Sequence, residues 1–442
     1  MGLKYIEQVK SIVLILLILL SLTLTFSIWT YSPTIQTNEG ATVDISIAEK
    51  KSMEDIIKPY RMVISEEAML RGSFTSQPIE YVLEKMKTWE IQKVQLARHK
   101  VDSDQINSMI KTPNRVSFFF AADVPVEILG NMLNFTDQNL PAAYFNRLII
   151  DWNEDTSDSM IIYFISTSQQ EMYTATVEKV NKLGFTNRIL KYAETMQVYN
   201  EIIRDNQLSL YASLIPENII SYTYSIKDID TDKFKDALFN NPSLVRSNSV
   251  STSEQQFTDD SALMNVDFTK KSLNYVHPAS ENENLMNSVD LLQNSLKFVN
   301  EHNGWTDDYR YSRMNTANRQ INYQLYFAGL PVFSRDMINE ISQMWGVDRV
   351  YKYIRPLYTL KGAIPFETRE VQLASGQSIY DFLSTATEIN MDAIDDVVIG
   401  YYLSRDENKE HFNLEPSWYY LQSGSWIRIS PELLGGAKFG LE

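Results

Sequence analysis

The chain has 442 residues, of which 44% are hydrophobic and 22% charged, the proportions of an ordinary globular protein. Its net charge of −16 argues against nucleic acid or another polyanion as the main partner. The absence of cysteine excludes disulfides, a thiol nucleophile and attachment through a lipidated cysteine. A chain of this length exceeds one hydrophobic core, so two or three domains are expected.

The first feature along the chain is residues 11–31, which carry no charge and are rich in Leu, Ile, Val and Phe. As a helix rising about 1.5 Å per residue, this segment reaches roughly 31 Å, enough to cross the hydrocarbon of a bilayer. Two lysines precede it, and Trp29 lies near its end, where aromatic rings favour the headgroup layer. The pattern predicts a transmembrane helix, with residues 1–10 in the cytoplasm and residues 32–442 outside the membrane.

A cleaved signal peptide is the alternative for this segment. It needs an apolar run of about 7–15 residues followed by small residues at a cut site. The run here is longer, and residues 26–31 contain no clear small-x-small pair. An uncleaved anchor is therefore the preferred interpretation.

The anchor contains the candidate partner-binding residues Ser21, Thr25 and Trp29. Ser21 and Thr25 lie four residues apart, and small hydroxyl side chains let helices approach closely and hydrogen-bond across an interface. Hydroxyl groups in a helix also bond to carbonyls of the same helix, so contact with a partner is one of two interpretations.

A first extracytoplasmic α+β domain is predicted over residues 32–190. A helix over residues 76–97 is expected because apolar residues recur at i, i+3, i+4 and i+7 from Ile79. The other expected elements are a short strand at 43–47, strands at 115–122, 160–165 and 172–177, and a short helix at 125–133.

A central α+β domain (residues 191–284) and a C-terminal α+β domain (residues 285–442) are predicted to share a strand-helix-strand plan. The central elements are a strand at 222–226, a helix at 231–239 capped by Thr231, a loop at 240–260 and strands between 262 and 276. The C-terminal elements are a helix from 285 to near Gly304, a strand at 321–327, a helix at 335–345 capped by Ser334 and a strand at 350–354. They continue with a capping box at Ser378 and Asp381, a strand at 396–403 and a hairpin over 418–429 turning at Ser423-Gly424.

Residues that carry enzyme or metal chemistry are scattered. The four histidines lack metal-ligand spacing, and no nucleophile elbow or phosphate loop is present. The acidic string at 151–155 lacks the glycine and the closing glutamate of a calcium loop. The acid pairs at 307–308 and 395–396 leave a hydrolase open, although such a site needs two carboxylates about 5 Å or more apart across one bond. No catalytic residue, cofactor or metal site is predicted.

The basic start, the apolar run from Lys10 to Thr30 and the acidic, cysteine-free body together resemble the YycH family. The likeness also includes Gly304-Trp305, the strand from Tyr323 to Gly329, and the closing hairpin around Trp418 and Trp426. It covers essentially the full length and depends on layout, because the family has no catalytic signature.

The resemblance implies a single-pass membrane protein of low-GC Gram-positive bacteria with a three-domain exterior. It implies partnership with a YycI-like membrane protein and the sensor histidine kinase YycG (WalK), whose two-component system governs cell-wall metabolism. The expected function is non-enzymatic regulation of that kinase through contacts between transmembrane helices. A membrane-anchored module that binds an exterior ligand, or a wall-polysaccharide hydrolase, is the alternative.

Overall fold

The computed structural model describes residues 14–23, 25, 48–67, 69–153, 158–225, 227–278, 286–346, 349–360, 365–406 and 411–430. It divides into two compact units, Met1–Asp44 and Ile45–Glu442. The predicted strand at 43–47 lies outside the described residues.

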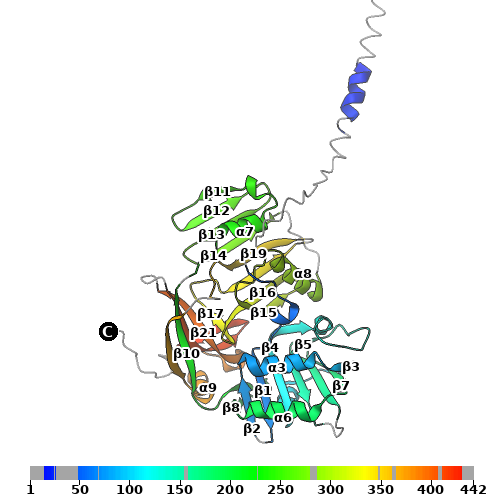
Figure 1. Cartoon of the computed structure of the whole chain (residues 1–442), viewed down its shortest axis with the longest axis vertical. Coiled ribbons are helices and arrows are strands. Elements are labelled where there is room, and N and C mark those ends of the chain that lie inside the picture. Colours follow the sequence, from blue (N-terminus) through cyan, green and yellow to red (C-terminus); the bar gives the residue numbers. More distant parts are fainter. Residues whose placement is uncertain are drawn as a thin grey trace, which may run out of the picture. The chain divides into compact units, whose positions relative to one another are not determined.

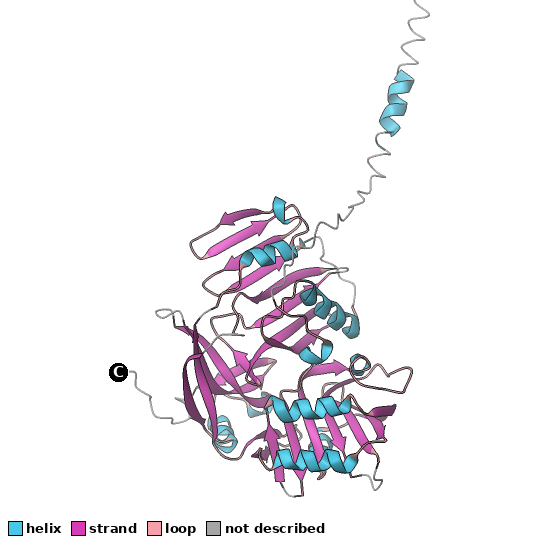
Figure 2. Cartoon of the chain, in the orientation of Figure 1, coloured by secondary structure: helices cyan, strands magenta, loops and turns pink. Residues whose placement is uncertain are grey.

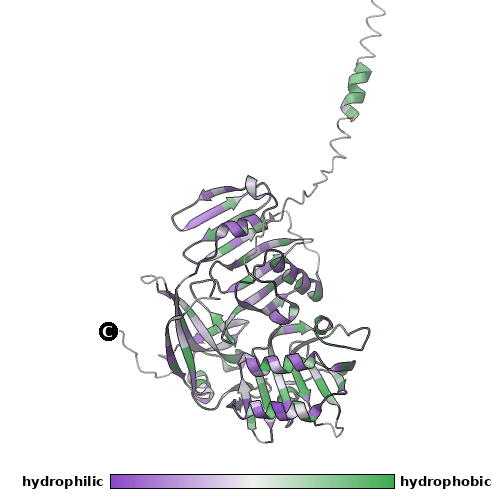
Figure 3. Cartoon of the chain, in the orientation of Figure 1, coloured by the Kyte–Doolittle hydropathy of each residue, from purple (hydrophilic) through white to green (hydrophobic). Residues whose placement is uncertain are grey.

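The first unit contains a helix over residues 14–23. Its apolar side chains from Leu14 to Leu22 keep 51–62% of their surface exposed, and Figure 3 shows this helix as a continuous hydrophobic segment. Within the described part of the chain, no helix is both long and apolar enough to span a membrane. Residues 11–13, 24 and 26–31 of the predicted span lie outside that part.

The first sheet of the second unit is antiparallel. Nine strands among the described residues form it, in the order β3-β7-β6-β5-β4-β1-β2-β8-β9. Their bounds are β1 (Arg61–Glu66), β2 (Met69–Ser73), β3 (Glu90–His99), β4 (Arg115–Pro125), β5 (Tyr144–Asp151), β6 (Met160–Ser166), β7 (Glu171–Glu178), β8 (Gln197–Ile202) and β9 (Leu210–Ser213). The accompanying helices are α2 (Met53–Ile56), α3 (Ser76–Met86), α4 (Ser103–Lys111), α5 (Val126–Leu129) and α6 (Lys182–Ala193).

Strand alternation gives this first sheet two buried faces. Phe118 and Phe120 of β4 point into the large core beneath α3 and α6, which cross one face of the sheet (Figure 1). Phe119, between them, packs on the opposite face with Ile106 and Ile110 of α4. The continuous apolar run of β4 is therefore explained by helices on both sides.

The second sheet is larger. Its fourteen strands in the described residues follow the order β11-β12-β13-β14-β19-β18-β16-β17-β21-β22-β10-β20, with β15 beside β16 and β23 beside β22 (Figure 2 shows the extent of both sheets). Their bounds are β10 (Glu217–Ser225), β11 (Arg246–Ser249), β12 (Glu254–Thr258), β13 (Leu263–Asp267), β14 (Ser272–Val276), β15 (Asp308–Asn315), β16 (Gln320–Phe327), β17 (Leu330–Phe333), β18 (Glu340–Trp345), β19 (Val350–Pro356), β20 (Pro365–Leu373), β21 (Ile394–Asp406), β22 (His411–Gln422) and β23 (Ser425–Ile429). The helices are α7 (Thr231–Leu238), α8 (Ser288–Glu301) and α9 (Gly376–Thr385), with 3-10 turns at Pro242–Leu244 and Met391–Ala393.

Two parts of this sheet share one plan, a helix followed by a four-stranded antiparallel meander. Helix α7 leads into β11–β14, and helix α8 leads into β15, β16, β18 and β19. The meanders join through their last strands, where Tyr275 of β14 lies opposite Tyr353 of β19. The repeated unit thus differs from the predicted strand-helix-strand plan, and both copies lie within residues 231–356. The domain boundaries at 190/191 and 284/285 remain predictions.

Several predicted elements are confirmed. Strands occur where they were expected at 115–122, 160–165, 172–177, 321–327, 350–354 and 396–403. The closing hairpin turns through Ser423 and Gly424, which both have positive φ, as a tight two-residue turn requires. Residues 222–225 of the strand predicted at 222–226 belong to β10. The helix predicted at 125–133 is present as the shorter α5 (Val126–Leu129), and the helix predicted from 285 is present as α8, which begins at Ser288.

Other predictions are wrong. Residues 335–345 do not form a helix, because β18 occupies Glu340–Trp345. Ile341, Gln343 and Trp345 are buried at a period of two, and this pattern prevails over the helical spacing of Met337 and Ile341. The Ser334 hydroxyl does accept the Met337 N–H at 3.2 Å, but only a local turn follows.

The remaining corrections concern ends and caps. The helix predicted over 76–97 ends at Met86, and Glu90–His99 form β3, a bulged strand with Lys93 at positive φ. The predicted loop at 240–260 contains β11 and β12. The N-cap of α7 is Asp230 instead of Thr231, and the N-cap of α9 is Ser375 instead of Ser378. The side chains of Asp230 and Ser375 accept free backbone N–H groups in the first turns of these helices.

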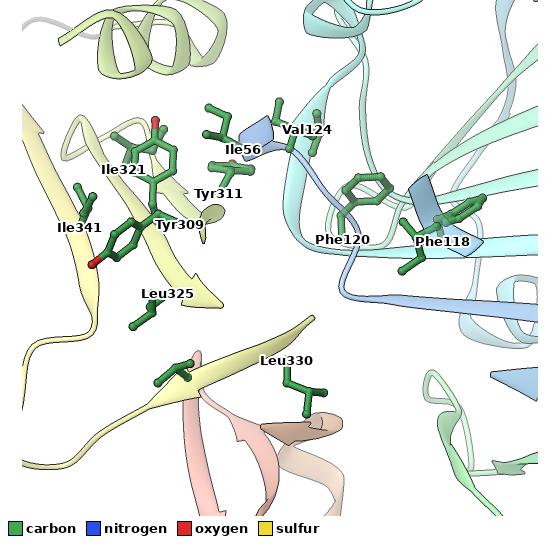
Figure 4. Close-up of a cluster of buried hydrophobic side chains, with 14 of the residues drawn as sticks. Ile56, Phe118, Phe120, Val124, Tyr309, Tyr311, Ile321, Leu325, Leu330 and Ile341 are labelled. Atoms are coloured by element: carbon green, nitrogen blue, oxygen red, sulfur yellow. The ribbon is translucent and has the colours of Figure 1, made fainter. Parts of the chain in front are cut away.

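One core connects the two sheets of the second unit. Phe118, Phe120 and Val124 of β4 belong to the same buried cluster as Tyr309 and Tyr311 of β15. Ile56 of α2 is fully buried between these two groups (Figure 4). The short helix α2 therefore occupies the seam between the sheets.

Candidate functional site

Two of the three candidate anchor residues lie on described helical positions. The Thr25 hydroxyl donates to the Ser21 carbonyl oxygen at 2.8 Å, and the Thr23 hydroxyl bonds in the same way to the carbonyl oxygens of Leu19 and Leu20. These bonds match the self-bonding interpretation and leave the hydroxyl oxygens able to accept a further donor. Trp29 lies outside the described residues.

The second unit begins with a segment, residues 48–58, that we call the strap. It contains α2, whose first turn is stabilised by Ser52 and Asp55. The Asp55 carboxylate accepts the Ser52 backbone N–H at 2.8 Å and the Ser52 hydroxyl at 2.7 Å. A four-residue helix is too short to be stable by itself, so its contacts with the sheets hold it in place.

Asn300 near the end of α8 binds the strap backbone at Lys51. The Asn300 Oδ1 accepts the Lys51 N–H at 2.9 Å, and the Asn300 Nδ2 donates to the Lys51 carbonyl oxygen at 2.8 Å. The Trp305 Nε1 also donates to Asn300 Oδ1, at 2.9 Å. A side-chain amide thus pairs with the strap as a neighbouring strand would.

The Lys51 ammonium group is enclosed by the start of β15. It donates to the Asp307 carbonyl oxygen at 2.9 Å, lies 3.8 Å from the Asp308 carboxylate and lies 5.6 Å from the centre of the Trp305 ring. Burial lowers the pKa of Lys51 to about 8, and Asp308 offsets part of that shift. Asp308 also pairs with Arg310 at 2.7 Å. The strap therefore holds a cation at a desolvated position.

The strap also contacts the first sheet. Glu54 pairs with Lys87 at 2.8 Å and Lys58 lies 3.9 Å from Glu80, both partners belonging to α3 or its end. Two cavities, of about 470 Å³ and about 190 Å³, border α2, and Asp55 and Lys58 line both of them. A displacement of the strap would therefore reach both sheets.

A buried ion pair joins the sheets near the strap. Arg61 at the start of β1 lies 3.0 Å from the Asp396 carboxylate of β21, and both side chains are at least nine-tenths buried. Burial opposes the charge of Arg61, but Asp396 and then Tyr60 keep its pKa above the ordinary value. Burial and then Asp396 raise the pKa of Tyr60, whose hydroxyl donates to the same carboxylate. This arrangement fixes the sheets relative to each other.

The acid pairs considered for catalysis take part in structural bonds. The Asp307 carboxylate accepts the Leu360 N–H at 2.8 Å, Asp308 pairs with Arg310, and Asp396 pairs with Arg61. In the acidic string at 151–155, Asp151 pairs with Arg115 at 2.7 Å. Within the described ranges, no group of three or more His, Asp or Glu residues is arranged to hold a metal ion.

Sequence reasoning missed the strap contacts. Lys51 and Asn300 are 249 positions apart, and no local pattern connects them. In the sequence, Trp305 contributes to the family resemblance but gives no indication of a contact with the strap. A buried lysine can be recognised only after the fold is known, because lysine is an ordinary surface residue in a sequence.

The fold and site define an α+β protein in which a strap, preceded along the chain by an exposed apolar helix, contacts two sheets that share a core. Family profiles identify it further: the YycH protein N-terminal domain matches residues 7–192, and the YycH protein C-terminal domain matches residues 207–434. The chain therefore belongs to the YycH family, as the resemblance predicted.

Individual relatives agree with this assignment. The chain is 23% identical over 460 residues to the two-component system WalR/WalK regulatory protein YycH of Bacillus subtilis (strain 168), and the match covers 99% of each chain. The crystal structure of YycH from Bacillus subtilis has a TM-score of 0.74 at 20% identity, covering 87% of this chain and 99% of that chain. The second likeness supports the fold.

Proposed function

We propose that this protein is an accessory regulator of a WalK-type (YycG-like) sensor histidine kinase and performs no chemistry of its own. The observation that carries the proposal is the match along 99% of both chains to a relative named as a regulator of the WalR/WalK system. The protein is a single-pass component of the cell membrane, with a cytoplasmic N-terminus and an extracytoplasmic body. Its partners are the kinase and a YycI-like membrane protein, and through them it adjusts cell-wall metabolism.

The anchor makes the regulatory contact. Residues 11–31 lie in the membrane, and the face with Ser21, Thr25 and Trp29 meets a helix of the kinase or of the YycI-like protein. Thr25 keeps its bond to the Ser21 carbonyl while its oxygen accepts a donor from the partner. Each 1.4 kcal/mol of contact that favours one kinase conformation changes the ratio of the two by about tenfold.

The strap connects the anchor to the exterior body. Its position supports this role, because Lys51 is bound to Asn300 on one sheet's helix and Glu54 pairs with Lys87 beside the other sheet. A change in the arrangement of the sheets would alter the strap and hence the anchor that precedes it in the chain.

The test replaces residues 11–31 with an unrelated Leu-rich span that keeps both flanks, and measures kinase output in cells that lack the native copy. Loss of regulation at unchanged protein abundance is expected. The double variant Ser21→Ala/Thr25→Ala should reproduce part of the loss. Thr23→Ala is the matched control, because Thr23 also bonds within the helix but faces elsewhere. Unchanged output with the replaced span would remove the anchor from the mechanism.

A wall-polysaccharide hydrolase receives less support from the geometry. It needs two carboxylates that face one bond, whereas Asp307 accepts the Leu360 N–H and Asp396 pairs with Arg61. Binding of an exterior ligand is compatible with regulation and is favoured by a separate cavity.

A further inference from the structure

A cavity of about 450 Å³ lies where the two sheets of the second unit meet. Its lining comes from β4 and β5 of the first sheet, from β15 to β18 of the second, and from the β22–β23 hairpin. In Figure 1, β4 and β5 face β15 at this position. The volume lies within the usual range of small-molecule sites. No residue of the strap lines this cavity.

Aromatic rings line much of the cavity, on both sheets. They include Tyr144, Tyr311, Tyr326, Phe333 and Trp426. Several are fixed by their neighbours. The Tyr311 hydroxyl donates to the Asp123 carbonyl oxygen at 2.9 Å, and the ring centres of Phe333 and Trp426 are 5.8 Å apart. Aromatic faces attract cations through the ring quadrupole.

The polar part of the lining includes the side-chain amide of Gln324. Gln324 is 5% exposed, and its Nε2 donates to the carbonyl oxygens of Val332 and Asn339, which fixes the orientation of the amide. No donor to its Oε1 is found among the described residues. This oxygen is not enclosed by the protein, because it is absent from the buried side-chain atoms that lack a partner, so it is an accessible acceptor on a residue that lines the cavity.

Two carboxylates add negative charge to the cavity. Asp123 accepts the hydroxyl groups of Ser166, at 3.1 Å, and of Ser168, and forms no ion pair with a described residue. Glu340 accepts the Asn322 amide at 2.8 Å. Arg313 is the only basic residue among the described residues of the lining; it lies 4.0 Å from Glu340 and is 56% exposed. The charged side chains of the lining, two carboxylates and one guanidinium, therefore leave a net negative charge in the cavity.

We propose that this cavity binds a primary ammonium group carried on a short aliphatic chain. An ammonium group has three donors and no acceptor, which complements this lining, and its chain packs against the rings. The source is either a free diamine or the lysine side chain of a short peptide. The ligand would contact β4, β16 and β18 together and so stabilise one arrangement of the two sheets.

The test is calorimetric titration of the full chain in detergent with cadaverine and, separately, with Nα-acetyl-lysine methylamide. The isosteric Nα-acetyl-norleucine methylamide, which lacks the amine, is the matched control ligand. We expect heat from at least one amine and binding about tenfold weaker or worse for the norleucine compound. Tighter binding of cadaverine identifies a free diamine, and tighter binding of the lysine compound identifies a peptide side chain.

Variants locate the binding. Asp123→Asn and Glu340→Gln preserve shape and should each weaken amine binding by about tenfold. Asp104→Asn, which removes an exposed carboxylate on α4, should change it by less than about twofold. Absence of heat from both amines at about 10 mM would overturn the proposal. Equal binding of the norleucine compound, or amine binding unaffected by both cavity variants, would overturn it too. Such failures leave kinase regulation standing, because the proposal does not depend on it.

Discussion

His302, at the end of α8, is a buried histidine held in its neutral form. Its ring lies among Phe298, Phe234 and Tyr353, and its Nε2 is 3.3 Å from the Tyr353 hydroxyl. Burial, and then the Arg355 guanidinium, lower the pKa of His302 to about 3. Between pH 6.5 and 3 the unfolded chain therefore binds a proton that the folded chain does not, so stability falls as the pH falls.

We predict that His302 contributes about 2 kcal/mol to the loss of unfolding free energy of the Ile45–Glu442 unit between about pH 7 and pH 5. Urea unfolding at the two pH values measures this loss, and His302→Gln should remove that part. The difference between the losses of the wild type and of His302→Gln gives the contribution of His302, since both proteins share every other titrating group. His99→Gln, at an exposed histidine beside Glu171, should retain the wild-type loss. Equal losses in wild type and His302→Gln would contradict the assignment.

Arg61 and Asp396 form a buried ion pair between the sheets, so removal of one partner leaves the other charged and desolvated. We predict a cost of about 3–5 kcal/mol for Arg61→Met or for Asp396→Leu. The double variant should cost clearly less than both together, because no lone buried charge remains. Denaturant midpoints of the four proteins complete the cycle. Lys179→Met, in the exposed pair with Glu90, should leave the midpoint unchanged. Additive costs would show that the pair is not coupled.

At the scale of elements, patterns predicted most strands because burial on one or both faces leaves a local signal. The apolar run at 160–165 and the alternating pattern at 172–177 predicted β6 and β7 from local sequence alone. The helix predicted at 335–345 failed because Met337 and Ile341, four residues apart, fit the helical period and the strand period equally well. The sheet resolved this ambiguity: β16 and β19 lie on either side of β18 and supply its hydrogen bonds.

The candidate site was harder to predict than the elements. The strap is recognised by contacts with Asn300 and Asp307, which are distant in sequence and become neighbours only after both sheets have formed. Ser21 and Thr25 were identified because a membrane-like segment constrains its few polar residues strongly. Their role as partner contacts remains a prediction.

The turn between β16 and β17 is an element whose geometry demands glycine. Gly329 has φ +84°. A Cβ there would lie 2.7 Å from the carbonyl oxygen of Phe74, the residue that follows β2 of the first sheet. Gly424 has a similar φ of +75° with nothing within 4 Å. Both Gly→Ala variants should lose about 1 kcal/mol to backbone strain. Only Gly329→Ala also forces backbone apart, at a further cost of about 1–3 kcal/mol. Thermal unfolding compares the two variants, and equal shifts would show that the contact with Phe74 is unimportant.

At the scale of the whole molecule, the two sheets are joined into one folding unit by a shared core. Side chains of β4 and β15 belong to one buried cluster, with Ile56 of the strap between them (Figure 4). A structure of two separate domains would show two cores and a polar interface. Local sequence patterns do not reveal that a four-residue helix closes the seam between the sheets.

Cooperativity of unfolding tests this view of the molecule. Because one core includes both sheets, we predict a single calorimetric transition for the Ile45–Glu442 unit. Ile56→Ala removes the side chain that bridges the seam, so it should cost about 2–5 kcal/mol and separate the transition into two.

Ile106→Ala is the matched control, because Ile106 is 2% exposed and belongs to α4, a helix that packs on β1 and β4 of the first sheet and not at the position of the strap. It should lower the transition temperature without separating the two sheets, since the cavity it creates lies between α4 and the first sheet. Two transitions in the wild type, or the same separation in Ile106→Ala, would mean that the sheets respond independently. The strap would then transmit to only one of them.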